Sequence, residues 1–555
     1  MNDSHCSRVP FAVPGVVALC LLLGGCTFGF GRGATGELVV PRERLRAIEP
    51  ATMEQIAASA PRPVSTTAPT TLPTTLPVAL QGQREVKLTI EQARKLALAN
   101  NLEIQVQLFD PAIARTSVTE EEGRFEALFN TSANFDKTDT PTSTRLESNQ
   151  AKNLTVQPGI EIPLVTGGTL RADLPLGRFE TDNQFSTLNP AFTSNFVVSF
   201  SQPLLRNGGV FTTTQGIRLA FYEYQASQAR TKLEIIRVLT VADRAYWRLY
   251  AARQEAVLRR QEYDLAVAQM QRARRQANAG MVADVDIIRA ESGVADTLEN
   301  VIIADNQLRD RQRELKRILN SAEMPMDAPV AVVPTTDPRP LRYSVDATEL
   351  AKAAVANRME MLETELQIAR DVSEIAVARN SALPLVALDY SYSVNGLGRT
   401  WDDSFQLLHD NDFADHHLAL RVQVPIGNEA ALSRVRRALL RRLQTLATRD
   451  QRDLQIRQEV YNTVDQLDAT WQRMLAARER VVLAARVVEV EQRQFNLGLR
   501  TSTDVLDAQT RLANAQSSEV QAIAEYQIAQ VDIAQATGTV LGASRVDWAP
   551  APVPK

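Results

Sequence analysis

The pattern of apolar and polar positions predicts two very long helices. Residues 215–279 and 428–497 contain no proline and almost no glycine, and they consist largely of strong helix formers. At 1.5 Å per residue, each segment extends for roughly 100 Å. In the second segment, apolar side chains recur at steps of three and four residues, at Leu454, Ile456, Val460, Val464, Leu467, Trp471, Leu475 and Val482. Such a stripe needs neighbouring helices to cover it.

Shorter helical segments accompany the two long ones. Four of them are about half as long, at 284–320, 346–382, 89–127 and 502–537. Each long helix leads through a glycine turn into a short one, so two short helices placed end to end match one long helix. This predicts parallel helices of equal height. A generic coiled coil is the alternative, but it does not require matched half-lengths.

Four segments replace the helical period with strict alternation of apolar and polar residues. They are 128–136, 193–201, 385–394 and 417–424. Alternation over about ten residues is typical of a membrane β-strand, although a soluble sheet packed on helices gives the same pattern. Two hairpins cannot close a barrel, because open edges in lipid leave backbone groups unsatisfied. Strands in a membrane would therefore require several chains to share one barrel.

A further alternating pair surrounds Gly167-Gly168, within residues 154–174. It predicts one more hairpin, either in the membrane or in an extracellular extension. We favour the extension.

The folded body consists of two copies of one unit. Asn278-Ala279-Gly280 matches Asn496-Leu497-Gly498, and Asp286 matches Asp504 at the same offset. A proline-rich linker separates the copies. The predicted boundaries are a first repeat at 86–320, a linker at 321–345, a second repeat at 346–541 and a C-terminal tail at 542–555.

The N-terminus resembles that of an exported lipoprotein. Residues 1–25 carry an apolar core too short to span a bilayer, as in a signal peptide. Leu23-Gly24-Gly25-Cys26 resembles a lipobox, which makes Cys26 the expected lipid attachment site; a simple cleaved signal or an uncleaved anchor is the alternative. By resemblance to bacterial lipoproteins, Thr27 favours the outer membrane. Residues 26–85, rich in Pro and Thr, predict an extended tether.

Composition excludes several classes of function. The net charge of −4 gives no basic excess for nucleic acid, and no phosphate-binding glycine loop is present. All three cysteines lie within the first 26 residues, so the rest of the chain has no disulfide, zinc-thiolate site or cysteine nucleophile. No Ser/His/Asp arrangement is available either. We expect neither catalysis nor a cofactor.

Three of the four histidines cluster with aspartates between two predicted strands. The residues are His409, Asp410, His416 and His417. This set could ligate a divalent metal, but a solvated extracellular loop is the simpler explanation. We favour the loop and expect no metal site.

Together these features resemble the TolC-like outer membrane factor lipoproteins, over residues 86–541. The resemblance implies a mostly α fold with a small β part. It implies a homotrimer with a 12-stranded transmembrane β-barrel, two hairpins per chain, on a long periplasmic α-helical barrel. It also implies a passive exit duct for small molecules, drugs or metal ions, reached from an inner-membrane pump through a periplasmic adaptor. Protein secretion of type I and a pore-less periplasmic coiled-coil lipoprotein are the alternatives.

The resemblance assigns functional residues to the two glycine turns. Family turns of this kind dock adaptor hairpins, and the matching positions are Gly280, Met281, Leu497, Gly498, Leu499 and Thr501. The first turn is the poorer match. A tight interhelical turn alone also accounts for both glycines.

The same resemblance assigns the pore aperture to carboxylates after the second turn. Asp504 and Asp507 are three residues apart and share a helix face. A threefold axis would collect about six carboxylates into a ring that attracts cations. Thr501-x-x-Asp504 also resembles a capping box, which is the simpler role for Asp504. In the first copy Asp286 aligns with Asp504, and Arg289 replaces the second aspartate, where it would pair with a ring carboxylate.

Overall fold

The computed structural model describes residues 84–143, 147–279, 283–497 and 499–544. The chain divides into two units, Met1–Leu76 and Pro77–Lys555, and every described residue belongs to the second. The predicted signal peptide and Cys26 lie outside the described residues, as do Gly280, Met281 and Gly498.

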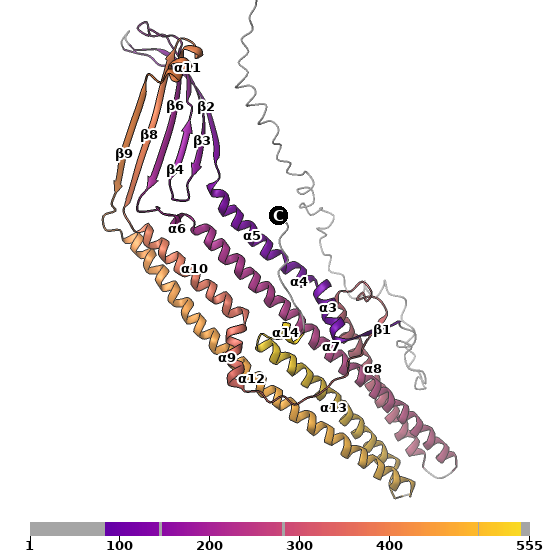
Figure 1. The fold of residues 1–555 in the computed structure, drawn as a ribbon. Helices are drawn as coiled ribbons and strands as arrows, with labels where there is room; N and C mark the ends of the chain where they lie inside the picture. Colours follow the sequence, from indigo (N-terminus) through magenta and orange to yellow (C-terminus); the bar gives the residue numbers. More distant parts are fainter. Residues whose placement is uncertain (1–83, 144–146, 280–282, 498, 545–555) are drawn as a thin grey trace, which may run out of the picture. The chain divides into compact units, whose positions relative to one another are not determined.

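The long helices predicted from the sequence are present (Figure 1). Helix α7 spans Gln215–Asn278 and α12 spans Glu429–Asn496. Their shorter partners across the two turns are α8, Asp284–Leu319, and α13, Ser502–Ala536. Helix α7 packs against α8, and α12 packs against α13. Within the parts of the chain that the structure describes, no helix has both the length and the apolar character that a membrane span requires.

The other two predicted half-length helices are broken into shorter pieces. The segment predicted at 89–127 forms α3 (Ile90–Asn100), α4 (Leu102–Gln107) and α5 (Phe109–Glu122), and then a 3₁₀ turn. At the first break, Asn101 takes an extended conformation and caps α4. Its Oδ1 accepts from Ile104 N at 3.2 Å, and its Nδ2 donates to Ile318 O at 2.9 Å. An asparagine that satisfies these backbone groups favours a cap over a continuous helix.

A matching break divides the segment predicted at 346–382. It forms α9 (Ala347–Asn357) and α10 (Met359–Ser381) on either side of Arg358, which is extended. The Arg358 guanidinium pairs with Glu360 at 2.6 Å and with Glu459 of α12. The ion pairs anchor this break to the long helix of the same repeat.

The described residues contain a seven-stranded antiparallel sheet. The strands are β2 (Leu128–Asp139), β3 (Gln150–Pro163), β4 (Thr169–Asp173), β5 (Leu176–Thr181), β6 (Ala191–Pro203), β8 (Leu385–Gly398) and β9 (Ala414–Gln423). The main order is β2-β3-β4-β6-β8-β9, and β5 also pairs with β3 and β6. The four predicted strands are confirmed as β2, β6, β8 and β9.

The expectation of two hairpins per chain is wrong for this sheet. The hairpin around Gly167-Gly168 does not project as an extension: β3 and β4 lie between β2 and β6 and pair with both (Figure 1). The sequence pattern located the turn, but pairing partners depend on contacts distant in sequence.

A second, two-stranded sheet joins distant parts of the chain. Strand β1, Arg84–Leu88, pairs in parallel with β7, Val330–Pro334. The segment expected to be only a linker therefore contains a strand. Two short helices, α6 (Val210–Thr213) and α14 (Val540–Ala543), and α11 (Trp401–Asp410) complete the described elements.

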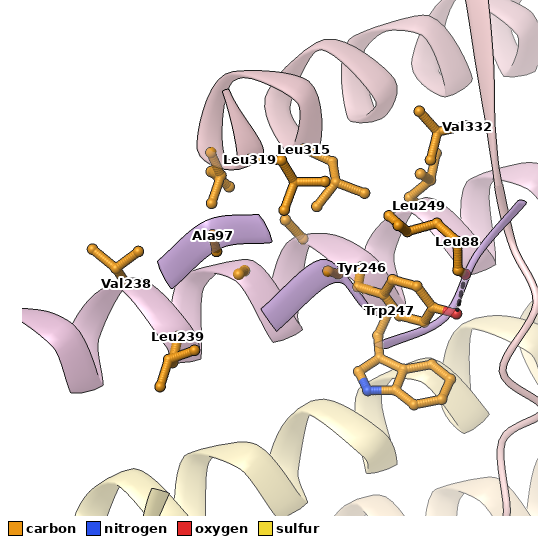
Figure 2. Close-up of a cluster of buried hydrophobic side chains, with 14 of the residues drawn as sticks. Leu88, Ala97, Val238, Leu239, Tyr246, Trp247, Leu249, Leu315, Leu319 and Val332 are labelled. Carbon is orange, nitrogen blue, oxygen red and sulfur yellow. Dashed lines mark hydrogen bonds between the residues drawn. The ribbon is translucent and has the colours of Figure 1, made fainter. Parts of the chain in front are cut away.

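The largest core surrounds the middle of α7 (Figure 2). Tyr246, Leu249, Leu315, Leu319 and Val332 are essentially inaccessible and bring α7, α8 and β7 together. The Tyr246 hydroxyl donates to Leu88 O at 3.0 Å and accepts from Thr336 N at 3.0 Å. These contacts fix the small sheet to the first long helix.

Candidate functional site: two interhelical turns and a two-faced sheet

The second interhelical turn leads into a capped helix. The Thr501 hydroxyl accepts from Asp504 N at 3.3 Å, and Asp504 Oδ2 accepts from Thr501 N at 2.9 Å. The Thr501 hydroxyl also donates to the same carboxylate oxygen at 2.8 Å. This is a reciprocal capping box. Hydrogen bonds from the Thr501 backbone and side chain keep the pKa of Asp504 below its usual value.

Asp507 has a different environment from Asp504. Its side chain is exposed, whereas Val505 and Ala508 on the same helix are buried. Leu497 and Leu499 of the turn are 69% and 73% exposed. Arg500 contacts Gln494 at 3.1 Å and Glu491 at 3.4 Å, which ties the turn back to the end of α12. The turn thus presents leucines outwards, and Asp507 remains free of a capping role.

The first interhelical turn is built differently. Helix α8 begins after Ala283 without a side-chain cap, although Asp284 and Asp286 lie in its first turn. Arg289 Nη1 lies 3.4 Å from Asp286 Oδ1 on the same helix. In the single chain, Arg289 therefore pairs with its own helix neighbour rather than with Asp504 or Asp507.

The short helices that follow the two turns contact each other. A Cβ added at Gly293 of α8 would lie 2.9 Å from Cδ2 of Leu506 of α13. Glycine permits this close approach of two helices. Leu506 lies between Asp504 and Asp507 in sequence, so this contact places the beginning of α13 against Gly293, which lies further along α8 than its first turn.

The sheet separates apolar from polar side chains on its two faces. Directly paired residues of neighbouring strands share a face. One row reads Phe129, Ile160, Ala172, Val198, Tyr392 and His416 across all the strands. The adjacent row, on the opposite face, reads Leu128, Glu161, Arg171, Ser199, Ser391 and His417.

Charged residues on the polar face are paired with one another, both within a strand and across strands. Arg171 lies 3.6 Å from Glu161 and 3.9 Å from Asp173, and Arg421 lies 3.0 Å from Asp389. The first set lies on β3 and β4, and sequence analysis did not identify it as functional. The alternation of apolar and polar residues around Gly167-Gly168 is the sequence signal that could have located this charged set.

The histidine cluster does not form one site. Helix α11 ends at Asp410, and β9 begins at Ala414, so the expected irregular loop is partly a helix and partly a strand. His416 and His417 are adjacent on β9 and face opposite sides of the sheet. The His416 ring lies against Tyr390 and Tyr392, with centroids 6.4 and 5.0 Å away. Within the described residues, no three His, Cys, Asp or Glu side chains gather as metal ligands would.

The described residues thus combine a sheet that has one apolar and one polar face with two long helices, each followed by a shorter one. Residues 350–539 match the family described as outer membrane efflux protein. In this region the chain resembles the outer membrane efflux proteins, and TolC proteins are among its relatives in sequence.

Two relatives illustrate the likeness in sequence. The outer membrane protein TolC of Vibrio cholerae is 23% identical over 62% of this chain and 76% of its own length. TolC of Escherichia coli strain K12 is 25% identical over 49% of this chain, and the alignment spans about half of its own length, 55%.

A solved structure supports the fold. A membrane protein from Pseudomonas aeruginosa superimposes with a TM-score of 0.62 at 16% identity, over 81% of this chain and 92% of its own. At that identity, the likeness concerns the fold.

Proposed function

We propose that this chain is the outer-membrane exit duct of a tripartite efflux system. Three copies would form a passive conduit that carries small molecules, drugs or metal ions, from an inner-membrane pump and its periplasmic adaptor to the outside. Cys26 would carry the lipid anchor, after removal of residues 1–25. The chain would be organised as repeats at 86–320 and 346–541, joined through 321–345 and followed by a tail at 542–555.

The two-faced sheet is the observation that carries this proposal. Its apolar face suits lipid, and its polar face suits a water-filled lumen. Its edge strands are exposed along nearly their whole length. Because unsatisfied backbone groups are costly in lipid, both edges need partners there, and other copies of the chain can provide them.

The turns provide the periplasmic end of the proposed duct. Leu497, Leu499 and Thr501, together with Gly280, Met281 and Gly498, would dock the adaptor. Exposed leucines on a short turn suit an apolar contact with a helical hairpin. Asp507 would line the aperture. Asp504 would cap its helix and also add its negative charge to the aperture. The Asp286–Arg289 pair would lie beside Asp504 and Asp507.

The assembly can be tested on protein extracted from outer membranes. We expect a trimer that dissociates on heating on a gel. A salt-extractable monomer would instead support a pore-less spacer lipoprotein. Scoring antibiotic, metal and protein export in a deletion strain then identifies the cargo, and loss of protein export alone would replace efflux by secretion.

The aperture can be tested by conductance in planar bilayers. Asp507→Lys should raise the conductance of the resting channel and reduce its preference for cations. The reason is that a lysine in the proposed ring would repel cations and attract the remaining carboxylates, where the aspartate attracts cations and repels carboxylates. Glu429→Lys, an exposed acid at the opposite end of α12, is the matched control. Unchanged conductance and selectivity in Asp507→Lys would remove this residue from the gate.

A further inference from the structure

We propose that each chain contributes six membrane strands, so that the trimer closes an 18-stranded barrel. This inference rests on the proposed trimeric duct and goes beyond it, since the expected barrel has 12 strands. The occupant of each open sheet edge is a second copy of this chain.

Strands β4 and β5 form one continuous strand, interrupted at Leu174 and Pro175. Asp173 pairs with Gly159, and Leu176 pairs with Val156, which is the same register on β3. The register against β6 is also continuous. Across the gap, Leu174 N donates to Pro158 O at 2.8 Å, and Asn195 N donates to Pro175 O at 3.0 Å. Pro175 lacks an N–H, so it interrupts the ladder without ending the strand.

The chain therefore runs up and down the sheet six times. The long strands are β2, β3, β4 with β5, β6, β8 and β9, and each is antiparallel to its neighbours. The shortest, β9, has 10 residues, enough for the 9–11 or so that a tilted membrane strand needs.

The additional hairpin, formed by β3 and by β4 with β5, has side chains that suit a membrane barrel. Its residues on the apolar face continue the apolar face of the other strands. They are Leu154, Val156, Pro158, Ile160 and Ile162 on β3, with Leu170, Ala172, Leu174 and Leu176 opposite the last four. At the far end of the band Arg178 lies opposite Leu154, and the charged pair Lys152–Glu180 follows it on the same face. From Leu154 to Ile162 this band extends for about 26 Å along the strand, or about 20 Å along an axis tilted by about 40°. That height is comparable with the apolar band of roughly 25 Å on membrane barrels.

The opposite face of the hairpin continues the polar face. Glu161, Arg171 and Asp173 lie there beside Ser199 and Ser391 of the neighbouring strands. Gly159 allows the strands to approach, because a Cβ there would lie 2.1 Å from Oδ1 of Asp173. A hairpin that extended away from the membrane would be in water on both sides. Its apolar and polar faces would then not need to continue the apolar and polar faces of the other strands.

The two edge strands of the sheet, β2 and β9, are suited to pair between chains. Strand β2 is exposed at every residue, and β9 at all but one. Six alternating strands leave the first and last pointing in opposite directions, so β9 of one chain can pair with β2 of the next in the antiparallel sense. Four strands per chain would instead require β2 and β3 to leave the sheet and expose Leu154, Ile160 and Ile162 to water.

The consequence is a wider duct. With strands about 4.8 Å apart and tilted by about 40°, 12 strands give a backbone diameter of about 24 Å and 18 strands about 36 Å. The lumen would be acidic, because the polar face carries Asp136, Glu161, Asp173, Asp389 and Asp415 against Arg171 and Arg421.

Paired cysteines test which strands meet between chains. Ala419→Cys on β9 is combined in turn with Asn130→Cys, Ser132→Cys or Asn134→Cys on β2, and all four positions lie on the polar face. Three positions on β2 are needed because the structure of a single chain does not fix the register between β9 and β2 of neighbouring chains. We expect at least one pair to form disulfide-linked trimers in outer membranes under oxidation. Ala419→Cys with Ser199→Cys on β6 is the matched control and should not link, because β8 separates those strands and disulfides need Cα atoms within about 7 Å.

The opposing arrangement predicts a different link. If β2 and β3 lie outside the barrel, Ala419→Cys should link with Thr169→Cys on β4, and never with β2. A single-particle reconstruction of the detergent-extracted wild-type protein then counts strands directly. Eighteen strands support the inference, and a trimer with 12 overturns it while leaving the proposed duct intact. A monomer whose sheet is outside the membrane overturns the proposed function itself.

Discussion

The long helices of the two repeats, α7 and α12, occupy equivalent positions in sequence but differ in burial. Helix α7 buries 19 of its 64 residues, and α12 only 8 of its 68. Helix α7 packs against α3, α4, α5, α8, α10 and α13, whereas α12 packs against α9, α10 and α13. The difference shows that the chain completes its own core around the first copy and leaves part of the second uncovered.

The uncovered part of α12 is apolar. Large apolar side chains are exposed at three positions on α7, but at eleven on α12. Those on α12 are Leu432, Leu439, Leu440, Leu443, Leu454, Tyr461, Leu475, Val482, Leu483, Val487 and Val490. An exposed apolar patch of this extent is typical of an interaction surface. In the proposed trimer, a neighbouring chain would cover it.

The largest expected effect is on the buried helix. Leu249→Ala removes a side chain that is fully buried in the core of Figure 2 and should lower the free energy of unfolding by about 2–5 kcal/mol. Thermal unfolding followed by circular dichroism measures this change. Val257→Ala, at an exposed site on the same helix, is the control and should shift unfolding far less. Equal shifts would contradict the assignment of the core to the middle of α7.

A smaller effect on folding, but a clear effect on assembly, is expected on α12. Leu443 is 61% exposed in the single chain, and burying a leucine contributes about 1.5–3 kcal/mol. Leu443→Glu should therefore weaken the trimer by at least about tenfold per interface, since 1.4 kcal/mol corresponds to a factor of ten. Sedimentation in detergent measures the trimer fraction, and circular dichroism should show unchanged helix content.

The matched control for Leu443→Glu is Gln451→Glu. It adds the same charge at an exposed polar position of α12. If both variants dissociate alike, charge repulsion explains the loss and the apolar surface does not hold the chains together.

The smallest expected effect concerns the two turns. Thr501→Ala removes the cap of α13 and should cost about 0.5–2 kcal/mol locally. Ala283→Ser offers α8 the cap that it lacks and should slow exchange there. Hydrogen exchange of the first turns of α13 and α8 measures both changes. Thr503→Ala, an exposed non-capping neighbour, is the control.

The cap also carries a pH dependence. The pKa of Asp504 is lower in the folded chain than in the unfolded chain, where it is about 3.9. The ionised carboxylate therefore gives its full contribution to the stability of the folded state above that unfolded value. It is lost as the pH falls through the lower folded pKa. The difference between wild type and Thr501→Ala should therefore be present at neutral pH and shrink in strong acid. Part of the difference should remain in acid, because the Thr501 hydroxyl also accepts from Asp504 N. A difference of unchanged size in strong acid would show that the carboxylate contributes nothing to the cap.

Sequence pattern predicted the long helices and four of the strands, because their periodicity is local and sustained. It missed the breaks at Asn101 and Arg358, where a capping side chain and an ion pair to α12 override good helix formers. It also placed the hairpin around Gly167-Gly168 outside the sheet. The alternation was visible, but Pro175 obscured the second strand, and strand partners are set by distant contacts.

At the site, the sequence offered both roles for Asp504, and the structure shows the capping box. The aperture role of Asp507 depends on where three chains place it, which stays a prediction. The cross-strand charges on β3 and β4 could be found only once the register was known.

The parallel pairing of β1 with β7 has a consequence for dividing the gene. Val332 of β7 belongs to the core around Tyr246, so this strand completes the first copy although it follows α8 in the chain. If the gene were split between Leu319 and Val330, β7 would be on the fragment that carries the second copy, away from the core to which it belongs. A split between Pro334 and Asp346 would keep β1 and β7 on one polypeptide. Val540 of the other polypeptide would still have to join that core, so the two are suited to reassociate when co-expressed.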